Sequence, residues 1–168
     1  MIHYFFGLAA NPFTKAHQRI IERILEEDPL NKLYVAITDH AYKEVDLMLP
    51  FDLRQSIVEA NLSDYIRDGR VVLMRQTKRT YEFLSETWDM MDYIVVGEDE
   101  WESLKAGEWM YSAELMHTYK FKVIARNDDV SSSEVRKLLK NGAAFDKLEH
   151  YITKKTYDLL ISFYCIER

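Results

Sequence analysis

Short apolar runs alternate with longer amphipathic segments along the whole chain. Five runs have the length and composition of buried strands: Met1–Gly7, Leu33–Thr38, Val71–Met74, Tyr93–Val96 and Phe121–Ala125. The other segments place apolar residues at helical spacing, and they predict helices over Thr14 to Glu27, Pro50 to Tyr65, Thr80 to Met90, one or two within Glu98–His117, Ser131–Lys140 and Thr153–Tyr164.

This alternation of strand and helix predicts an α/β fold. Strands that are apolar on both faces are typical of a parallel sheet covered by helices on both sides. We therefore expect a Rossmann-like, doubly wound parallel sheet of about five strands with helices on both faces, in a single domain over residues 1–168. In such a sheet the ligand lies in the crevice beyond the carboxyl ends of the strands.

Composition and charge narrow the class of protein. The 168 residues are 48% hydrophobic, enough for an ordinary core, and a net charge of −6 without a basic stripe argues against a nucleic-acid surface. No apolar stretch of about 18 residues and no signal-peptide pattern is present, so we expect a cytoplasmic protein that does not enter the membrane. The single cysteine, Cys165, excludes internal disulfides and a cysteine-based zinc site. The apolar segment Leu159–Tyr164 either caps the core or forms a contact in a homo-oligomer.

The junction between the first strand and the first helix has the pattern of an anion site. The strand ends at Gly7, and Leu8-Ala9-Ala10 and the turn pair Asn11-Pro12 lead into the helix. The first turn of a helix has free N–H groups and the positive end of the dipole. Thr14 and His17 share a face there, because they are three residues apart. A hydroxyl and an imidazole would then face a bound anion; the alternative is a plain helix start with His17 on the surface.

Candidate functional residues also follow the other predicted strands. They are His40 and Lys43 after the second strand, Arg75, Lys78, Arg79 and Thr80 after the third, Gly97 and Asp99 after the fourth, and Arg126 after the fifth. Basic residues recur at these strand ends in an acidic protein, which predicts a local positive potential around an anionic ligand. The alternative is that loops are polar and carry lysine and arginine by default.

A second anion site is predicted at the start of the helix over Ser131–Lys140. Ser131 and Glu134 have the spacing of a capping box, which indicates a helix N-terminus. Ser132, Ser133 and Arg136 share the first turn or so of this helix, so hydroxyls, free N–H groups and a guanidinium come together there. A plain cap is the alternative interpretation of the serines.

Both of these stretches resemble signatures of the nucleotidylyltransferase superfamily. Gly7 to His17 is similar to its Gly, Asn-Pro and T-x-G-H pattern, with Ala16 in place of the glycine, and Val130 to Arg136 is similar to its I-S-S-T-x-I-R motif. The resemblance implies catalytic roles for His17, Thr14 and Arg136. It also implies an ATP site formed by Gly7, Leu8, Ala9, His17, Gly97, Ser132, Ser133 and Arg136.

The middle of the chain resembles the nicotinate (or nicotinamide) mononucleotide adenylyltransferases. The similar stretches are His40 to Lys43, Asp52 to Arg54, Thr80 to Leu84, Val95 to Asp99 and the region of Trp109. The residues that this resemblance assigns to the mononucleotide are Lys43, Arg54, Thr80, Asp99 and Trp109. Each has a structural alternative: Asp99 as a helix cap, Trp109 as core and Arg54 as support for its helix.

The resemblance implies transfer of the adenylyl group of ATP to the 5′-phosphate of the mononucleotide, with pyrophosphate leaving on Mg²⁺. The phosphate is itself the nucleophile, so catalysis would be positioning and charge stabilisation. No residues stand at metal-ligand spacing, so Mg²⁺ would come with ATP. Phosphopantetheine adenylyltransferases share the T-x-x-H pattern, so adenylylation of phosphopantetheine or another nucleotidylyl transfer is the first alternative. A non-catalytic nucleotide-binding sensor, favoured by Ala16 and Thr14, is the second.

Overall fold

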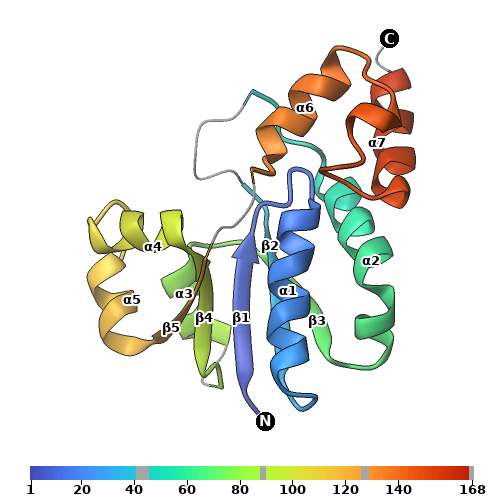
Figure 1. Cartoon of the computed structure of the whole chain (residues 1–168). Coiled ribbons are helices and arrows are strands. Elements are labelled where there is room, and N and C mark those ends of the chain that lie inside the picture. Colours follow the sequence, from blue (N-terminus) through green and yellow to red (C-terminus); the bar gives the residue numbers. More distant parts are fainter. Residues whose placement is uncertain (41–45, 88–89, 126–128, 167–168) are drawn as a thin grey trace.

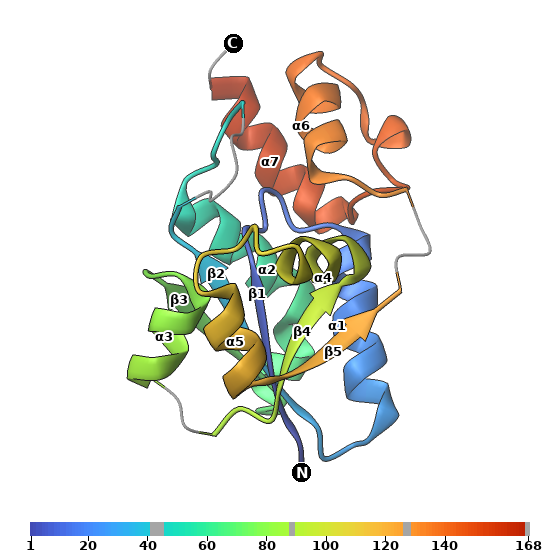
Figure 2. The same ribbon diagram turned by 90° about the vertical axis from the view of Figure 1, so that its left-hand side faces the viewer.

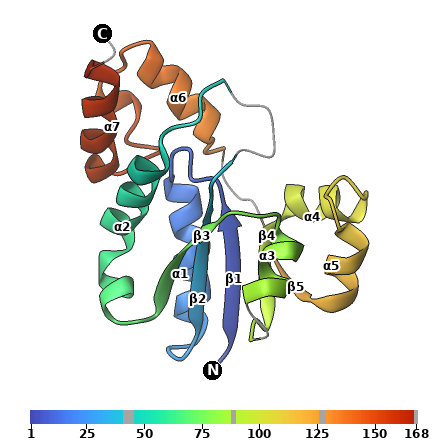
Figure 3. The same cartoon turned by 180° about the vertical axis from the view of Figure 1, so that it is seen from behind.

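The computed structural model describes residues 1–40, 46–87, 90–125 and 129–166. In this part of the chain, parallel strands form one five-stranded sheet in the order β3-β2-β1-β4-β5, seen from opposite sides in Figures 1 and 3. The strands are β1 (His3–Leu8), β2 (Lys32–Thr38), β3 (Val71–Gln76), β4 (Tyr93–Gly97) and β5 (Lys120–Ile124). The helices are α1 (Lys15–Glu27), α2 (Phe51–Arg67), α3 (Thr80–Thr87), α4 (Glu98–Lys105), α5 (Ser112–Thr118), α6 (Ser132–Lys140) and α7 (Lys154–Ile166), with a 3₁₀ turn, η1 (Phe145–Lys147), before α7. The predicted Rossmann-like, doubly wound sheet is confirmed.

The central strands are buried on both faces, and alternate side chains enter two separate cores. On β1, Tyr4 and Phe6 pack into the core that contains Ile21 of α1 and Ile57 of α2. Phe5 points the other way, into the core beneath α3, α4 and α5. Figure 2 shows α3 and α5 on one side of the sheet and α1 on the other. The continuous apolar runs in the sequence follow from this burial, because neither face of a central strand meets water.

The order of the strands creates a switch point between β1 and β4. The chain moves from β1 outward to β2 and β3, returns to pair β4 with the other edge of β1, and then adds β5. Loops that leave neighbouring strands at such a point turn to opposite faces, and this opens a crevice beyond the strand ends. Helices α6 and α7 lie at this end of the molecule (Figure 1).

The last helix belongs to the core. Leu160 is fully buried, and Leu159 and Phe163 pack partly buried against the core that α1 and α2 share. Asn61 of α2 donates from its side chain to the Thr156 hydroxyl at 2.7 Å, which joins the two helices. Of the two interpretations of this apolar segment, the structure therefore supports the cap on the core. None of the described helices has the length and apolar character needed to span a bilayer.

The predicted element boundaries differ from the structure at a few ends. The third strand continues two residues beyond Met74, to Gln76, and the second helix continues to Arg67. Gln76 is 1% exposed, so a polar side chain ends a buried strand where an apolar pattern could not signal it.

Candidate active site

Two adjoining pockets lie at the carboxyl ends of the strands. We call the first, of about 550 Å³, the serine pocket, because Ser131, Ser132 and Ser133 at the start of α6 line it. We call the second, of about 520 Å³, the tryptophan pocket, because Trp109 lines it. Four residues line both pockets: His17, Glu100, Ser132 and Arg136. The two pockets therefore meet beside the N-terminal turns of α1 and α6.

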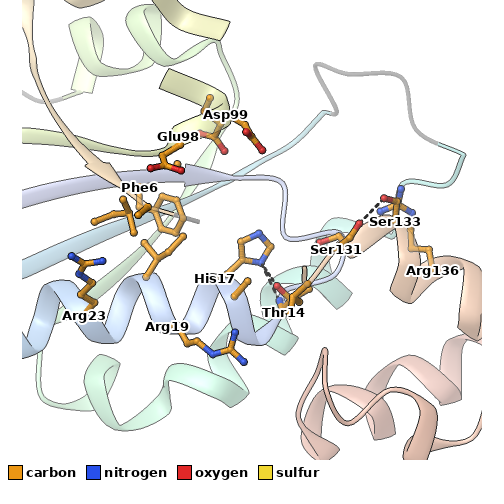
Figure 4. Close-up of a pocket in the computed structure, with 18 residues that line it drawn as sticks. Phe6, Thr14, His17, Arg19, Arg23, Glu98, Asp99, Ser131, Ser133 and Arg136 are labelled. Carbon is orange, nitrogen blue, oxygen red and sulfur yellow. Dashed lines mark hydrogen bonds between the residues drawn. The ribbon is translucent and has the colours of Figure 1, made fainter. Parts of the chain in front are cut away.

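The orientation of His17 is set by the residue that begins its helix. The backbone N–H of Thr14 donates to Nδ1 of His17 at 3.0 Å, and the Thr14 hydroxyl oxygen lies 3.2 Å from the same nitrogen (Figure 4). Because a backbone N–H can only donate, Nδ1 is an acceptor, and a neutral imidazole then carries its hydrogen on Nε2. The ring of Phe13 stacks on the His17 ring with centroids 5.5 Å apart. His17 is thus presented as an Nε2–H donor in a restrained orientation.

Thr14 supports the site more than it faces it. Its side chain is 2% exposed, although it lines the serine pocket. As the N-cap of α1 it holds the imidazole through its backbone, so its main observed contact is with His17. The hydroxyl and the imidazole are paired as predicted, and the hydroxyl lies at the Nδ1 edge of the ring.

The start of α6 is bound to the loop between β1 and α1. Ser132 donates from its hydroxyl to the Pro12 carbonyl oxygen at 2.9 Å. Arg136 is 5% exposed, and its Nη1 donates to the Asn11 carbonyl oxygen at 2.6 Å. At the N-cap, the Ser131 and Ser133 hydroxyls lie 2.8 Å apart (Figure 4). These contacts bring together two helix N-termini that are more than a hundred residues apart in sequence.

Arg136 also forms an ion pair beside the site. Its Nε and Nη2 donate to one carboxylate oxygen of Asp46, at 3.1 and 2.9 Å. The hydrogen bond from Arg136 holds the pKa of the Asp46 carboxyl below its ordinary value. No local pattern could indicate a role for Asp46, because its partner lies 90 positions away along the chain.

The serine pocket receives acidic residues from one side and basic residues from the other. Glu98 and Asp99 begin α4, whereas Arg19 and Arg23 project from α1 (Figure 4). Gly97, the N-cap of α4, also lines this pocket, and a Cβ added there would meet no protein atom within 4 Å. This glycine leaves space beside the pocket and is not required by its backbone conformation.

The tryptophan pocket has apolar walls and a polar end. Trp109 lines it together with Met110 and Leu115. At the polar end, Gln76 donates through Nε2 to the Thr80 hydroxyl at 3.3 Å and to the Lys78 carbonyl oxygen at 2.9 Å. The predicted ATP contacts Gly7, Leu8 and Ala9 line this pocket, not the serine pocket. Gly7 is needed for space, because a Cβ there would lie 3.0 Å from Oε1 of Gln76.

The structure separates the residues predicted to bind the mononucleotide. Thr80 and Trp109 share the tryptophan pocket, but Asp99 lines the serine pocket instead. Lys43 lies outside the described residues, and so does Arg126.

Arg54 lines neither pocket, which corrects the prediction that it binds the mononucleotide. It is 1% exposed, and it donates to the carbonyl oxygens of Leu49, Ala9, Thr38 and Asp39. Its guanidinium supports the loops behind the site by donating to these four backbone carbonyl groups.

Of the basic residues after the third strand, two form ion pairs away from the pockets and one lines a pocket. Arg75 pairs with Asp39 at 2.5 Å, and Lys78 pairs with Glu86 at 2.6 Å. Neither lines the serine pocket or the tryptophan pocket, whereas Arg79 lines the tryptophan pocket. Gln76 was missed because the predicted strand ended too early, and Asn11 was noticed only as part of a turn.

Asn11 connects the loop of the first motif to residues 46–49. Its side chain donates to the Leu47 carbonyl oxygen at 2.7 Å and accepts the Leu49 N–H at 2.9 Å. It is 4% exposed, so its amide replaces the backbone partners that this irregular segment lacks.

Comparison with known proteins gives the same type of fold. The family model described as Cytidylyltransferase-like matches residues 5–138. A protein of Acholeplasma laidlawii (strain PG-8A), named "Probable nicotinate-nucleotide adenylyltransferase", is 28% identical over 180 aligned residues, which cover 92% of this chain and 93% of that protein.

Solved structures of Plasmodium falciparum nicotinic acid mononucleotide adenylyltransferase are also similar. The complex with NaAD has a TM-score of 0.74 at 18% identity and covers 96% of this chain and 95% of that chain. The complex with APC has a TM-score of 0.72 at 18% identity and covers 96% and 94%. These likenesses concern the fold, whereas the family model spans β1 to α6 and both motifs. The chain therefore belongs to the cytidylyltransferase-like family.

Proposed function

We propose that this chain transfers the adenylyl group of ATP to the 5′-phosphate of nicotinate mononucleotide, forming the dinucleotide and pyrophosphate in NAD biosynthesis. Its family supports nucleotidyl transfer, and the Acholeplasma and Plasmodium proteins carry the name of this activity. The observation that carries the proposal is the meeting of two pockets at four residues, of which His17 and Arg136 can donate to phosphate; the others are Glu100 and Ser132. A reaction that joins two nucleotides through their phosphates requires two sites with a common cationic junction.

In this proposal ATP occupies the serine pocket and the mononucleotide occupies the tryptophan pocket. Asp99 and Gly97 then lie beside the adenosine, which replaces the expectation that Asp99 binds the mononucleotide. The pyridine ring stacks on Trp109, with Thr80 at the polar end of the pocket. The mononucleotide also lies beside Gly7, Leu8 and Ala9, since these residues line its pocket.

The chemistry requires positioning and charge stabilisation. An oxygen of the 5′-phosphate forms a bond to the α-phosphorus of ATP, and the bond from that phosphorus to the bridging oxygen of pyrophosphate breaks. The attacking phosphate is already anionic, so no general base is needed. His17 donates from Nε2 and Arg136 from its guanidinium to phosphate oxygens, while Ser132 and Ser133 hold the β- and γ-phosphates. Mg²⁺ enters with ATP, because phosphate oxygens are ligands that it prefers.

The experiment that tests this proposal is pyrophosphate release with ATP and Mg²⁺. Nicotinate mononucleotide, nicotinamide mononucleotide and phosphopantetheine are offered in parallel, and the product is identified by mass. We expect turnover with nicotinate mononucleotide. Turnover with phosphopantetheine alone would reject the proposed acceptor, and ATP binding without turnover for any acceptor would instead favour a nucleotide sensor.

A further inference from the structure

Arg136 lines both pockets, and its guanidinium is already paired with a carboxylate of the same chain. Nε and Nη2 of Arg136 both donate to Oδ1 of Asp46, at 3.1 and 2.9 Å. The Arg136 side chain is 6% exposed, whereas that of Asp46 is 57% exposed. A buried cation is therefore neutralised by an anion that reaches it from the solvent side.

Asn11 holds the backbone next to Asp46, and the Asp46 carboxylate also accepts from the backbone N–H groups of Asp46 and Leu47. Asn11 binds the Leu47 carbonyl oxygen at 2.7 Å and the Leu49 N–H at 2.9 Å. The third donor of Arg136, Nη1, goes to the Asn11 carbonyl oxygen at 2.6 Å. A side-chain rotation of Asp46 breaks its bonds to Arg136 and to these two N–H groups, while Asn11 keeps both the guanidinium and residues 47–49 in place.

A phosphate and a carboxylate use the same edge of a guanidinium. The Nε and Nη2 hydrogens form a planar fork that binds two oxygens of either anion. While Asp46 accepts from Nε and Nη2, a substrate phosphate cannot bind to these two nitrogens. Leaving the buried guanidinium without an anion would be costly, so one anion exchanges for the other.

We propose that Asp46 is an internal competitor that holds the phosphate-binding edge of Arg136 and is displaced by substrate phosphate. This inference rests on the proposed function, because that function assigns Arg136 to phosphate. Asp46 thereby weakens the binding of ATP and of the product pyrophosphate, and keeps the buried cation satisfied between turnovers.

The test is the affinity for inorganic pyrophosphate and for adenosine, each measured by calorimetry without an acceptor. Asp46→Asn and Asp46→Ala should bind pyrophosphate about 5- to 30-fold more tightly than the unmodified chain, the range of a charge-assisted pair with one exposed partner. Adenosine affinity should not change. Asp39→Asn is the matched control, because Asp39 also pairs with an arginine, at 2.5 Å, but that partner, Arg75, lines neither pocket, whereas Arg136 lines both. It removes one negative charge and should leave pyrophosphate affinity unchanged.

Several results would overturn the inference. Unchanged or weaker pyrophosphate binding by both Asp46 variants would mean that the carboxylate positions Arg136 and does not compete with phosphate. An equal gain in pyrophosphate affinity in Asp39→Asn would mean that the effect comes from the change in net charge and not from the release of Arg136. Thermal unfolding of each variant checks that it is folded, and Asp46→Asn keeps the size of the side chain should the alanine variant fail. Pyrophosphate binding needs no turnover, so failure of the proposed reaction appears separately, as an inactive but pyrophosphate-binding protein.

Discussion

Substitution of His17 separates a structural hydrogen bond from a catalytic one. Nδ1 accepts the Thr14 N–H at 3.0 Å, in the third position after an N-cap, where glutamine serves equally well as the acceptor. His17→Gln therefore keeps this reach-back bond and loses the Nε2–H donor. His17→Ala loses both. The pair of variants divides the effect of the residue between fold and chemistry.

The two losses have different magnitudes. Removing a donor that acts on charge in the transition state costs about 10²- to 10³-fold in kcat, so we expect that loss in both variants. Removing the capping bond costs about 1 kcal/mol of folding free energy, so we expect that loss only in His17→Ala.

The assays are steady-state pyrophosphate release and urea unfolding of the three proteins. The expected pattern is two inactive variants, of which one keeps the unmodified stability. Turnover near the unmodified rate in His17→Gln would refute the assignment of Nε2 to the phosphates. Equal destabilisation of both variants would refute the role of Nδ1.

Further predictions concern space, buried charge and pH. Gly97→Ala should raise the KM for ATP without changing stability, since the added Cβ meets no protein atom within 4 Å. Gly7→Ala should lower the unfolding free energy by about 1–3 kcal/mol, because the added Cβ lies 3.3 Å from the Phe5 ring. Urea titrations and ATP kinetics distinguish them. Arg54→Met should cost about 3 kcal/mol or more in the same titrations, because buried carbonyl oxygens lose a charged donor, and an unchanged midpoint would contradict this. The pKa of Asp46 is lowered in the fold, so its pairing stabilises the protein above the unfolded-state pKa of about 3.9, and this stabilisation is lost as the pH falls through the lower folded value. Calorimetric Tm values of Asp46→Asn and the unmodified chain should converge in acid; a constant difference would contradict the pairing.

Features set by neighbouring residues could be predicted from the sequence. The strands carry continuous apolar runs because both faces of the sheet are covered, and α1 and α6 begin at capping residues that bind their own first turn. The position of a ligand crevice followed from the parallel order alone. Thr14, His17 and the serines of α6 therefore needed no tertiary information, since each lies at a recognisable helix start.

Features set by distant partners could not be predicted in this way. Arg54 opens a helix much as a ligand-binding arginine would, but its guanidinium turns beneath the loops to backbone carbonyl groups. Asp99 begins α4 as expected, yet the position of β4 in the sheet places it in the serine pocket and not beside Trp109. A side chain in a loop has no periodicity that tells which way it points.

The sequence by itself determined the α/β class, the strand and helix segments and the two helix starts that form the junction, because hydrophobic periodicity and capping act over a few residues. Only the tertiary structure decided which residues share a pocket. The packing of α6 against the first loop joins Arg136 to Asn11, 125 positions away, and to Asp46, 90 positions away. Such pairings depend on the order of the strands in the sheet and on the path of each loop beyond the strand ends. Both are determined by the packing of the whole chain and not by neighbouring residues.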